Sequence, residues 1–240
     1  INFSSFDPRG AGTPLQFKFY DHMPELRGLI DNLPARFNID TGSRSELDIT
    51  GPFVVREGLR KRYTSGISAI TGWGAGGASR SYVVRIPKLS LGPVKVRSIV
   101  AGLNEDKGGS LSDPNYEGNL GSGLLKRFVV TFDYRRETMY LKSLNPPPLD
   151  AGAFDRSGMW INAADVGYRV VNVSAGGPAE QAGLVMGDLI TAIDRKPALP
   201  DGLADARLLL RSLPAGTAVT ISLTRDGQQR TTRMILRDLI

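Results

Sequence analysis

The first part of the chain consists of short runs in which apolar and polar residues alternate, separated by turns rich in glycine and proline. Alternation with a period of two predicts half-buried β-strands. Residues 26–30 and 35–39 are two such runs, and the turn-rich segment 31–34 between them predicts a β-hairpin. Further strands are predicted at residues 16–20, 47–50, 82–86, 94–100 and 128–134, with one short helical turn at residues 124–127.

The pattern changes after three consecutive prolines, Pro146-Pro147-Pro148. Such a run continues neither a helix nor a central strand and favours a stiff, extended spacer. Beyond it, the sequence predicts strands at residues 168–173 and 189–194, helices at residues 178–182 and 203–213, and a hairpin of residues 219–224 and 229–236 around Asp226-Gly227. We therefore predict a mainly β domain at residues 1–145, a proline linker at residues 146–150 and a small α+β domain at residues 151–240.

Composition and charge restrict the classes of protein to which this chain can belong. Of the 240 residues, 41% are hydrophobic and 22% are charged, as in soluble globular proteins. No apolar run approaches the length of roughly 20 residues that spans a bilayer, so no transmembrane segment is expected. The net charge of +6 is spread along the chain without a nucleic-acid-binding motif, so no nucleic-acid partner is expected. The chain begins at Ile1, which favours a piece of a longer precursor from which an N-terminal segment has been removed.

The chain has no cysteine and a single histidine, His22. Cysteine nucleophiles and thiolate metal sites are thereby excluded, and a Ser-His-Asp mechanism would have to use His22. His22 belongs to an Asp-His-Met-Pro turn between two predicted strands, which favours a surface loop. We expect neither a metal site nor a cofactor.

The strongest chemical signal is Asp40-Thr41-Gly42-Ser43, which places an acid where a predicted strand ends in a sharp turn. From residue 26 to residue 144 the chain resembles the retropepsin and pepsin clan of aspartic proteases. Residues 119–125 resemble the second fingerprint of that clan, with Asn119 where the family usually has an aliphatic residue, and residues 128–134 match the strand that follows in bacterial members. The resemblance implies a retropepsin-like acid-protease β lobe.

The same resemblance implies a role for each residue of the motif. Asp40 is the expected catalytic carboxylate, Thr41 would hydrogen-bond to a counterpart loop, Gly42 would permit the turn, and the Ser43 hydroxyl would bond the outer oxygen of Asp40. Catalysis in this clan needs two close carboxylates that share one proton, so that one activates water while the other protonates the substrate carbonyl.

This chain contains a single Asp-Thr-Gly. The second aspartate would come from an identical subunit or from an upstream lobe, because residues 21–25 also resemble the second lobe of bilobal bacterial proteins. An inactive descendant of a protease is the alternative.

The segment Gly72-Trp73-Gly74-Ala75-Gly76-Gly77 fits the spacing of a dinucleotide-binding loop. That function requires a helix after the loop. A β-type run closed by Pro87 follows instead, so nucleotide binding is rejected. In aspartic proteases a glycine-bearing hairpin covers the substrate, and Gly72, Trp73 and Gly74 are the expected flap residues. A plain flexible hairpin tip is the alternative.

The segment from Gly176 to Ile190, with its Gly-Gly-Pro and Gly-Asp-Leu-Ile motifs, resembles the PDZ domains of bacterial periplasmic proteases. The resemblance extends over residues 156–236 and implies a peptide or protein ligand that adds as a strand beside residues 157–161. The expected peptide-binding residues are Gly158, Met159, Trp160, Ile161 and Leu210. The alternative is that the apolar side chains among them belong to the core and the groove is vestigial.

The sequence thus predicts an aspartic endopeptidase whose PDZ domain recruits polypeptide substrates or C-terminal peptides. A catalytically inactive peptide-binding or scaffolding protein is the alternative. The PDZ resemblance places the chain in the bacterial periplasm or cell envelope.

Overall fold

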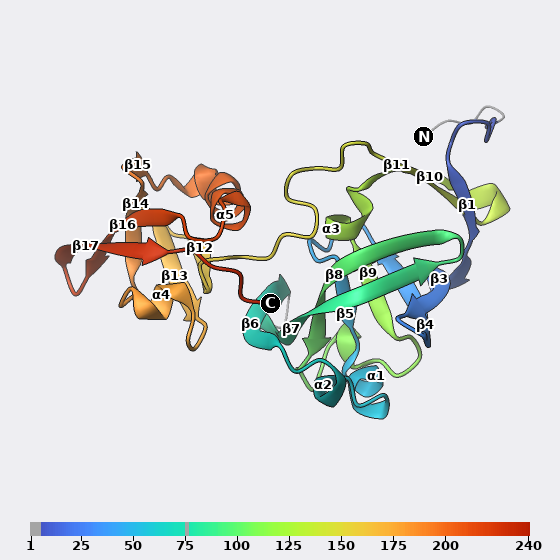
Figure 1. The fold of residues 1–240 in the computed structure, drawn as a ribbon, viewed down its shortest axis with the longest axis horizontal. Helices are drawn as coiled ribbons and strands as arrows, with labels where there is room; N and C mark the ends of the chain where they lie inside the picture. The colour runs from blue at the N-terminus through green and yellow to red at the C-terminus, as the bar shows by residue number, and fades with distance from the viewer. Residues whose placement is uncertain (1–5, 75–76) are drawn as a thin grey trace. The chain divides into compact units, whose positions relative to one another are not determined.

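A computed structural model describes residues 6–74 and 77–240 (Figure 1). The chain divides into two compact units. Unit 1 comprises Ile1–Ser65 and Thr71–Gly152, and unit 2 comprises Gly66–Ile70 and Ala153–Ile240. Unit 1 consists mainly of β-strands, and unit 2 combines a β-sheet with helices, as the sequence predicts.

An eight-stranded sheet dominates the first half of the described chain, and its strands are ordered β2-β3-β4-β9-β5-β8-β7-β6. In that order the strands are Lys18–Tyr20, Met23–Ile30, Leu33–Asp40, Gly118–Gly121, Leu47–Ile49, Val94–Asn104, Gly77–Leu91 and Gly66–Gly74. The predicted hairpin is confirmed as β3 and β4, joined by a turn in which Asp31 has a φ of 52°. The pairing of β4 with β9 is parallel and places Asp40 opposite Gly121.

Several strands differ in extent from the prediction, and two of these differences have a clear physical reason. The run predicted at residues 16–20 is split, because the chain leaves one sheet for another at Phe17. The Phe17 N–H bonds the Glu137 carbonyl at 2.9 Å, and the Phe17 ring is buried. The run predicted to end before Pro87 continues to Leu91, because the long β7–β8 pair, green in Figure 1, resumes its register at Lys88 opposite Arg97.

A three-stranded sheet ordered β1-β11-β10 completes the β structure of this half, with strands Thr13–Gln16, Thr138–Ser143 and Phe128–Asp133. The helices α1 (Gly51–Arg56) and α2 (Leu59–Arg62) were not predicted from the sequence, although Pro52 in the first turn of α1 is a residue typical of helix starts. The predicted helical turn is α3 (Ser122–Leu125). Two 3₁₀ turns span Ser110–Ser112 and Tyr134–Arg136.

A single apolar core supports the sheet that carries Asp40. Phe37 and Ile39 on β4, Leu47 on β5 and Leu120 on β9 are all 4% exposed or less and belong to the same buried cluster. The alternation of apolar and polar residues therefore identifies the core face. It also leaves Asp40 at the end of a strand that is anchored by buried neighbours.

The second unit contains a sheet ordered β12-β13-β14-β16-β17, with β15 paired to β14. These strands are Met159–Ala163, Tyr168–Val173, Leu189–Ile193, Ala218–Arg225, Gln228–Ile235 and, for β15, Lys196–Pro197. The helices are α4 (Pro178–Gln181) and α5 (Leu203–Ser212), with a 3₁₀ turn at Pro200–Gly202. All four predicted strands and both predicted helices are present, and β12 is an edge strand. Among the described residues, no helix has the length and apolar character needed to cross a membrane.

Candidate functional site

Asp40 is the last residue of β4, and its carboxylate is held by the turn that follows. The backbone N–H groups of Gly42 and Ser43 donate to Asp40 Oδ1 at 3.0 and 3.1 Å. These bonds fix the orientation of the carboxylate at the end of a buried strand. Thr41 and Gly42 are exposed at this turn, so Thr41 is open to a counterpart loop of the kind that the resemblance implies.

Residues 119–125, the second fingerprint predicted from the sequence, hold the loop that follows Asp40 in place by hydrogen bonds. Both the N–H and the hydroxyl of Ser122 donate to the Ser43 carbonyl, at 2.7 and 2.6 Å, and the Gly123 N–H donates to the Ser45 carbonyl at 3.1 Å. Gly121 is required here, because a Cβ on it would lie 2.2 Å from the Ser45 carbonyl oxygen. The two motifs are thus one structural unit, although about 80 residues separate them.

A buried ion pair secures the far end of this loop. Glu46 is 6% exposed and accepts hydrogen bonds from the Val100 N–H at 2.8 Å and the Gly152 N–H at 3.0 Å. Its third partner is the guanidinium of Arg127, which has only 17% of its side chain exposed. The loop from Asp40 to Leu47 is therefore fixed at both ends.

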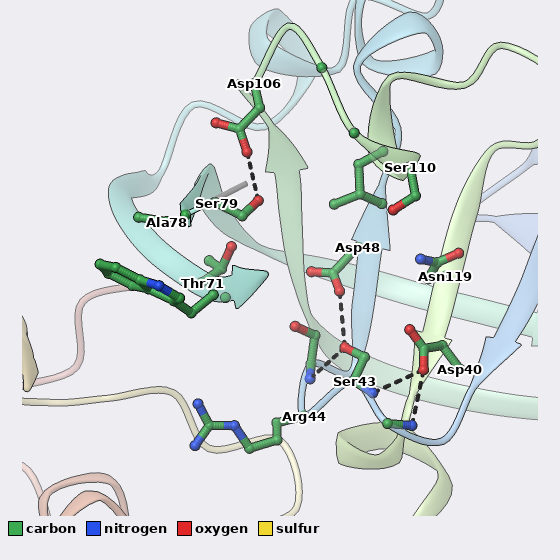
Figure 2. A pocket seen from close by; sticks show the side chains of 18 residues that line it. Asp40, Ser43, Arg44, Asp48, Thr71, Ala78, Ser79, Asp106, Ser110 and Asn119 are labelled. Atoms are coloured by element: carbon green, nitrogen blue, oxygen red, sulfur yellow. Dashed lines mark hydrogen bonds between the residues drawn. The ribbon is translucent and has the colours of Figure 1, made fainter. Parts of the chain in front are cut away.

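Ser43 differs from the role that the resemblance implies. Its hydroxyl donates to Asp48 Oδ2 at 3.3 Å, and the Ser45 N–H donates to the Ser43 hydroxyl at 3.2 Å. Of the polar groups of Ser43, the backbone N–H and not the hydroxyl bonds the Asp40 carboxylate (Figure 2). The physical reason is that Asp48, on β5, supplies a competing acceptor on the other side of Ser43.

Asp48 is the functional candidate that the sequence analysis missed. The residue is 8% exposed, and burial raises the pKa of its carboxyl to about 6, against hydrogen bonds from Ser45 and Ser43, with the charge of Asp40 adding to the increase. One feature of the sequence could have indicated Asp48: it is an acid between two apolar residues, Leu47 and Ile49, of a short core strand.

A polar row crosses the sheet at the same level. Glu25 on β3 lies opposite Asn38 on β4, Asn38 opposite Asn119 on β9, and Asn119 opposite Asp48 on β5. Residues directly opposite each other present their side chains on the same face of a sheet. The unusual Asn119 of the second fingerprint therefore belongs to a continuous polar row that leads to the site.

A cleft of about 900 Å³ lies beside these carboxylates and is lined by Asp40, Ser43, Asp48 and Asn119 together with residues of the glycine hairpin. Gly72 and Trp73 of the predicted flap line it, and the Trp73 side chain is 56% exposed. Gly74 ends β6, whereas Ala75 and Gly76 lie outside the described residues. A strand, β7, follows the loop, in agreement with the rejection of a nucleotide site.

The base of this hairpin is tied to the opposite wall of the cleft. Asp106 Oδ2 accepts a hydrogen bond from the Ser79 hydroxyl at 2.6 Å (Figure 2). It accepts another from the Arg80 N–H at 3.1 Å. His22, by contrast, is far from buried: 81% of its side chain is exposed, as expected for a surface loop.

In the second unit, the loop before β12 is occupied by its own side chains. Asp155 Oδ1 accepts from the N–H groups of Ser157 and Gly158 at 2.8 and 2.9 Å and from the Ser157 hydroxyl at 2.6 Å. The Met159 N–H donates to the same hydroxyl at 3.3 Å. The N–H groups of Ser157, Gly158 and Met159, beside which the sequence predicts a bound peptide, thus already have acceptors within the chain.

Three of the predicted peptide-binding residues are buried in the core of this unit. Met159, Ile161 and Leu210 are 8%, 2% and 1% exposed and belong to the core cluster of this unit. On the edge of β12, the Arg207 guanidinium of α5 donates to the Ile161 carbonyl at 2.6 Å and lies over the Trp160 ring, 4.7 Å from its centroid. A strand added at this edge would have to displace Arg207.

Comparison with protein families matches residues 169–225 to the PDZ domain. The chain therefore contains a PDZ domain. The match covers β13, α4, β14 and α5, together with the first strand of the final hairpin, and it confirms the PDZ resemblance read from the sequence. None of the curated proteins matches the sequence of this chain.

Solved structures that resemble parts of the chain include proteases and PDZ domains. An aminopeptidase N family protein from Idiomarina loihiensis is 28% identical over 38% of this chain, with a TM-score of 0.33, and only 15% of that protein is covered. The PDZ domain of a carboxy-terminal protease from Vibrio cholerae, in complex with peptide, is 19% identical over 35% of this chain and 95% of its own, with a TM-score of 0.31. A retropepsin-like aspartic protease from Rickettsia conorii is 16% identical over 53% of this chain and 95% of its own, with a TM-score of 0.38.

Proposed function

We propose that the first unit is one half of an aspartic endopeptidase and that the PDZ domain recruits its polypeptide substrate. The observation that carries the proposal is the position of Asp40, whose carboxylate ends a buried strand, accepts two backbone N–H bonds and lines a cleft beside a glycine hairpin. This arrangement presents a fixed carboxylate to a bound chain.

The mechanism follows from the chemistry of paired carboxylates. Two close aspartates share one proton, since both cannot ionise without strong repulsion. The ionised member takes a proton from water as the water attacks the peptide carbonyl, while the protonated member donates to the carbonyl oxygen. Asp40 supplies one of the two groups.

Asp48 is not the second member of this pair. Ser43 lies between Asp40 and Asp48, and the acceptor oxygen of Asp48 is directed to the Ser43 hydroxyl (Figure 2). The proposal therefore includes a second copy of this chain, or an upstream lobe, as the source of the partner aspartate. The exposed Thr41 turn is the surface that such a partner would contact.

Cleavage of an unfolded protein at mildly acid pH tests the proposal. The chain is prepared with and without an upstream segment, and its species are separated by mass. Each fraction is then assayed for cleavage of a reduced and carboxymethylated protein. We expect cleavage that pepstatin inhibits, in the fraction that contains two lobes. Absence of cleavage from every fraction and mixture would favour the non-catalytic peptide-binding alternative.

A location in the bacterial periplasm or cell envelope belongs to the same proposal. It is supported by the resemblance of the PDZ segment to those of periplasmic proteases. Fractionation of cells that produce the complete gene product, followed by detection of the chain in the periplasmic fraction, tests it.

A further inference from the structure

Ser43 lies between two carboxylates and has one hydroxyl proton for both. Its N–H is committed to Asp40, whereas its hydroxyl donates to Asp48 Oδ2 at 3.3 Å. A serine hydroxyl has one hydrogen to donate and two lone pairs that accept. The single hydroxyl proton can therefore serve one carboxylate at a time, and in this structure it is donated to Asp48.

The ionisation state of Asp48 decides which carboxylate receives the hydrogen bond of the Ser43 hydroxyl. As an anion, Asp48 only accepts hydrogen bonds, and it draws the Ser43 hydroxyl toward itself. Once Asp48 takes up a proton from solvent, its own O–H can donate to Ser43 Oγ. That oxygen already accepts the Ser45 N–H at 3.2 Å, and its second lone pair remains for Asp48. The Ser43 proton is then released to Asp40.

We propose that Asp48 is a positioning residue that directs the Ser43 hydroxyl, away from Asp40 when Asp48 is ionised and toward Asp40 when Asp48 is protonated. The inference rests on the proposed role of Asp40. It assigns this half-site an acid-dependent step that operates within one chain and needs no contribution from the partner lobe.

The surroundings of Asp48 favour a change of charge near mildly acid pH. Burial is the largest cause that raises the pKa of Asp48, to about 6, and the charge of Asp40 adds to it. The other charged groups that line the cleft are Arg44 and Asp106. Figure 2 shows the Arg44 side chain extending away from Asp48, and Asp106 is bonded to Ser79 on the hairpin.

The neighbours of Asp48 on the packed strands are uncharged. It lies opposite Asn119 on β9 and Gly102 on β8, and a Cβ on Gly102 would meet both Asp48 Oδ1 at 3.3 Å and the Ser81 side chain at 3.0 Å. Ser81 on β7 in turn accepts the Thr71 hydroxyl at 3.2 Å. Hydroxyl and amide groups thus surround the carboxyl, and they can accept or donate as its charge changes.

The first test is the pH profile of cleavage. Asp48→Asn imitates the protonated carboxyl, because its amide can donate to Ser43 Oγ. We expect this variant to extend activity toward neutral pH, with at least a fivefold gain over the wild type at pH 7 and little change at pH 4.5. In a Ser43→Ala background the same substitution should leave the shape of the profile unchanged. A uniform loss at all pH values, or an equal shift without the hydroxyl, would overturn the proposal.

The second test needs no catalytic activity. In an Asp40→Asn background, the amide resonances of Ser43 and Ser45 are followed by NMR between pH 4 and pH 8. We expect both to titrate with one midpoint near the pKa of Asp48 and to lose this titration when Asp48→Asn is added. Absence of the titration overturns the inference. If the titration is observed but the wild-type chain cleaves no peptide, the inference is supported and the proposed function is refuted.

Discussion

Gly121 lies against Ser45 so closely that a Cβ on the glycine would be 2.2 Å from the serine carbonyl oxygen. This contact joins the second fingerprint to the loop that carries Asp40. Gly121→Ala must therefore push the two segments apart, and overpacking of this kind destabilises proteins by about 1–3 kcal/mol. Urea unfolding should show a loss in this range.

Gly108→Ala is the matched control for that substitution. A Cβ on Gly108 meets nothing within 4 Å, so we expect its free energy of unfolding to stay within about 0.5 kcal/mol of the wild type. Equal stability of the two variants would contradict the close approach at Gly121.

The ion pair of Glu46 and Arg127 predicts a large loss of stability on Glu46→Gln. The substitution leaves the guanidinium, 17% exposed, without its carboxylate. Removing one partner of a buried pair costs about 3–5 kcal/mol, and partial exposure places the expected loss at the lower end. The exposed pair of Lys18 and Glu137 supplies the control, because Glu137→Gln should cost less than about 1 kcal/mol. Similar losses for both variants would show that Glu46 is not a buried anchor.

Asp48 predicts a pH dependence of stability with a definite sign. Because burial raises its pKa from 3.8 to about 6, the folded state keeps this proton over a range in which the unfolded state has lost it. The contribution of Asp48 to the free energy of unfolding therefore falls as pH rises from about 4 to about 6 and is constant above.

Asp48→Asn removes this component. The stability of the variant relative to the wild type should be greater at pH 7 than at pH 4, by about 2–3 kcal/mol. Urea unfolding at several pH values measures the difference. A difference that does not vary with pH would mean that Asp48 titrates normally.

Because Asp155 bonds the loop before β12, we expect the PDZ domain to lack the usual preference for peptides with a free C-terminal carboxylate. Where backbone N–H groups are free to capture a peptide carboxylate, the charge-assisted bonds favour a free C-terminus over an amidated one by roughly tenfold or more. Here Asp155 and Ser157 occupy these N–H groups. Fluorescence anisotropy should therefore show similar affinities for acid and amide forms of a peptide.

Asp155→Asn is the informative variant, because it keeps an acceptor in the loop and removes the negative charge that repels a ligand carboxylate. We expect it to increase the relative affinity for the free acid. A wild-type preference of tenfold for the free acid would contradict the internal occupation of the loop.

Local chemistry made much of the fold predictable. The alternation around residues 26–39 predicted the hairpin that ends at Asp40, and Asp226-Gly227 marked the turn of the last hairpin in the PDZ domain. Helices α1 and α2 were missed because each is only one or two turns long, too short for a helical period to emerge. The change of sheet at Phe17 depends on a bond to Glu137, which is distant in sequence.

The candidate site was predictable only in part, for a similar reason. The Asp-Thr-Gly turn is local, so its position was available from the sequence, whereas its hydrogen bonds to Ser122, about 80 residues away, were not. The competition between Asp40 and Asp48 for Ser43 depends on the register of β5 against β9, which no local pattern records. The burial of Met159, Ile161 and Leu210 shows the same limit, because apolar residues suit the lining of a groove and a core equally.

The rate of peptide cleavage by Asp40→Asn tests the central claim most directly. Asparagine preserves the acceptor for the Gly42 and Ser43 N–H groups, so the turn should fold, while the loss of the carboxylate should reduce kcat/KM at least about a hundredfold. Asp21→Asn is the control, because its side chain is 77% exposed and its φ of 54° suits asparagine. Activity lost in Asp40→Asn and kept in Asp21→Asn is the result we predict, whereas cleavage by Asp40→Asn at the wild-type rate would contradict the assignment of Asp40 as the catalytic carboxylate.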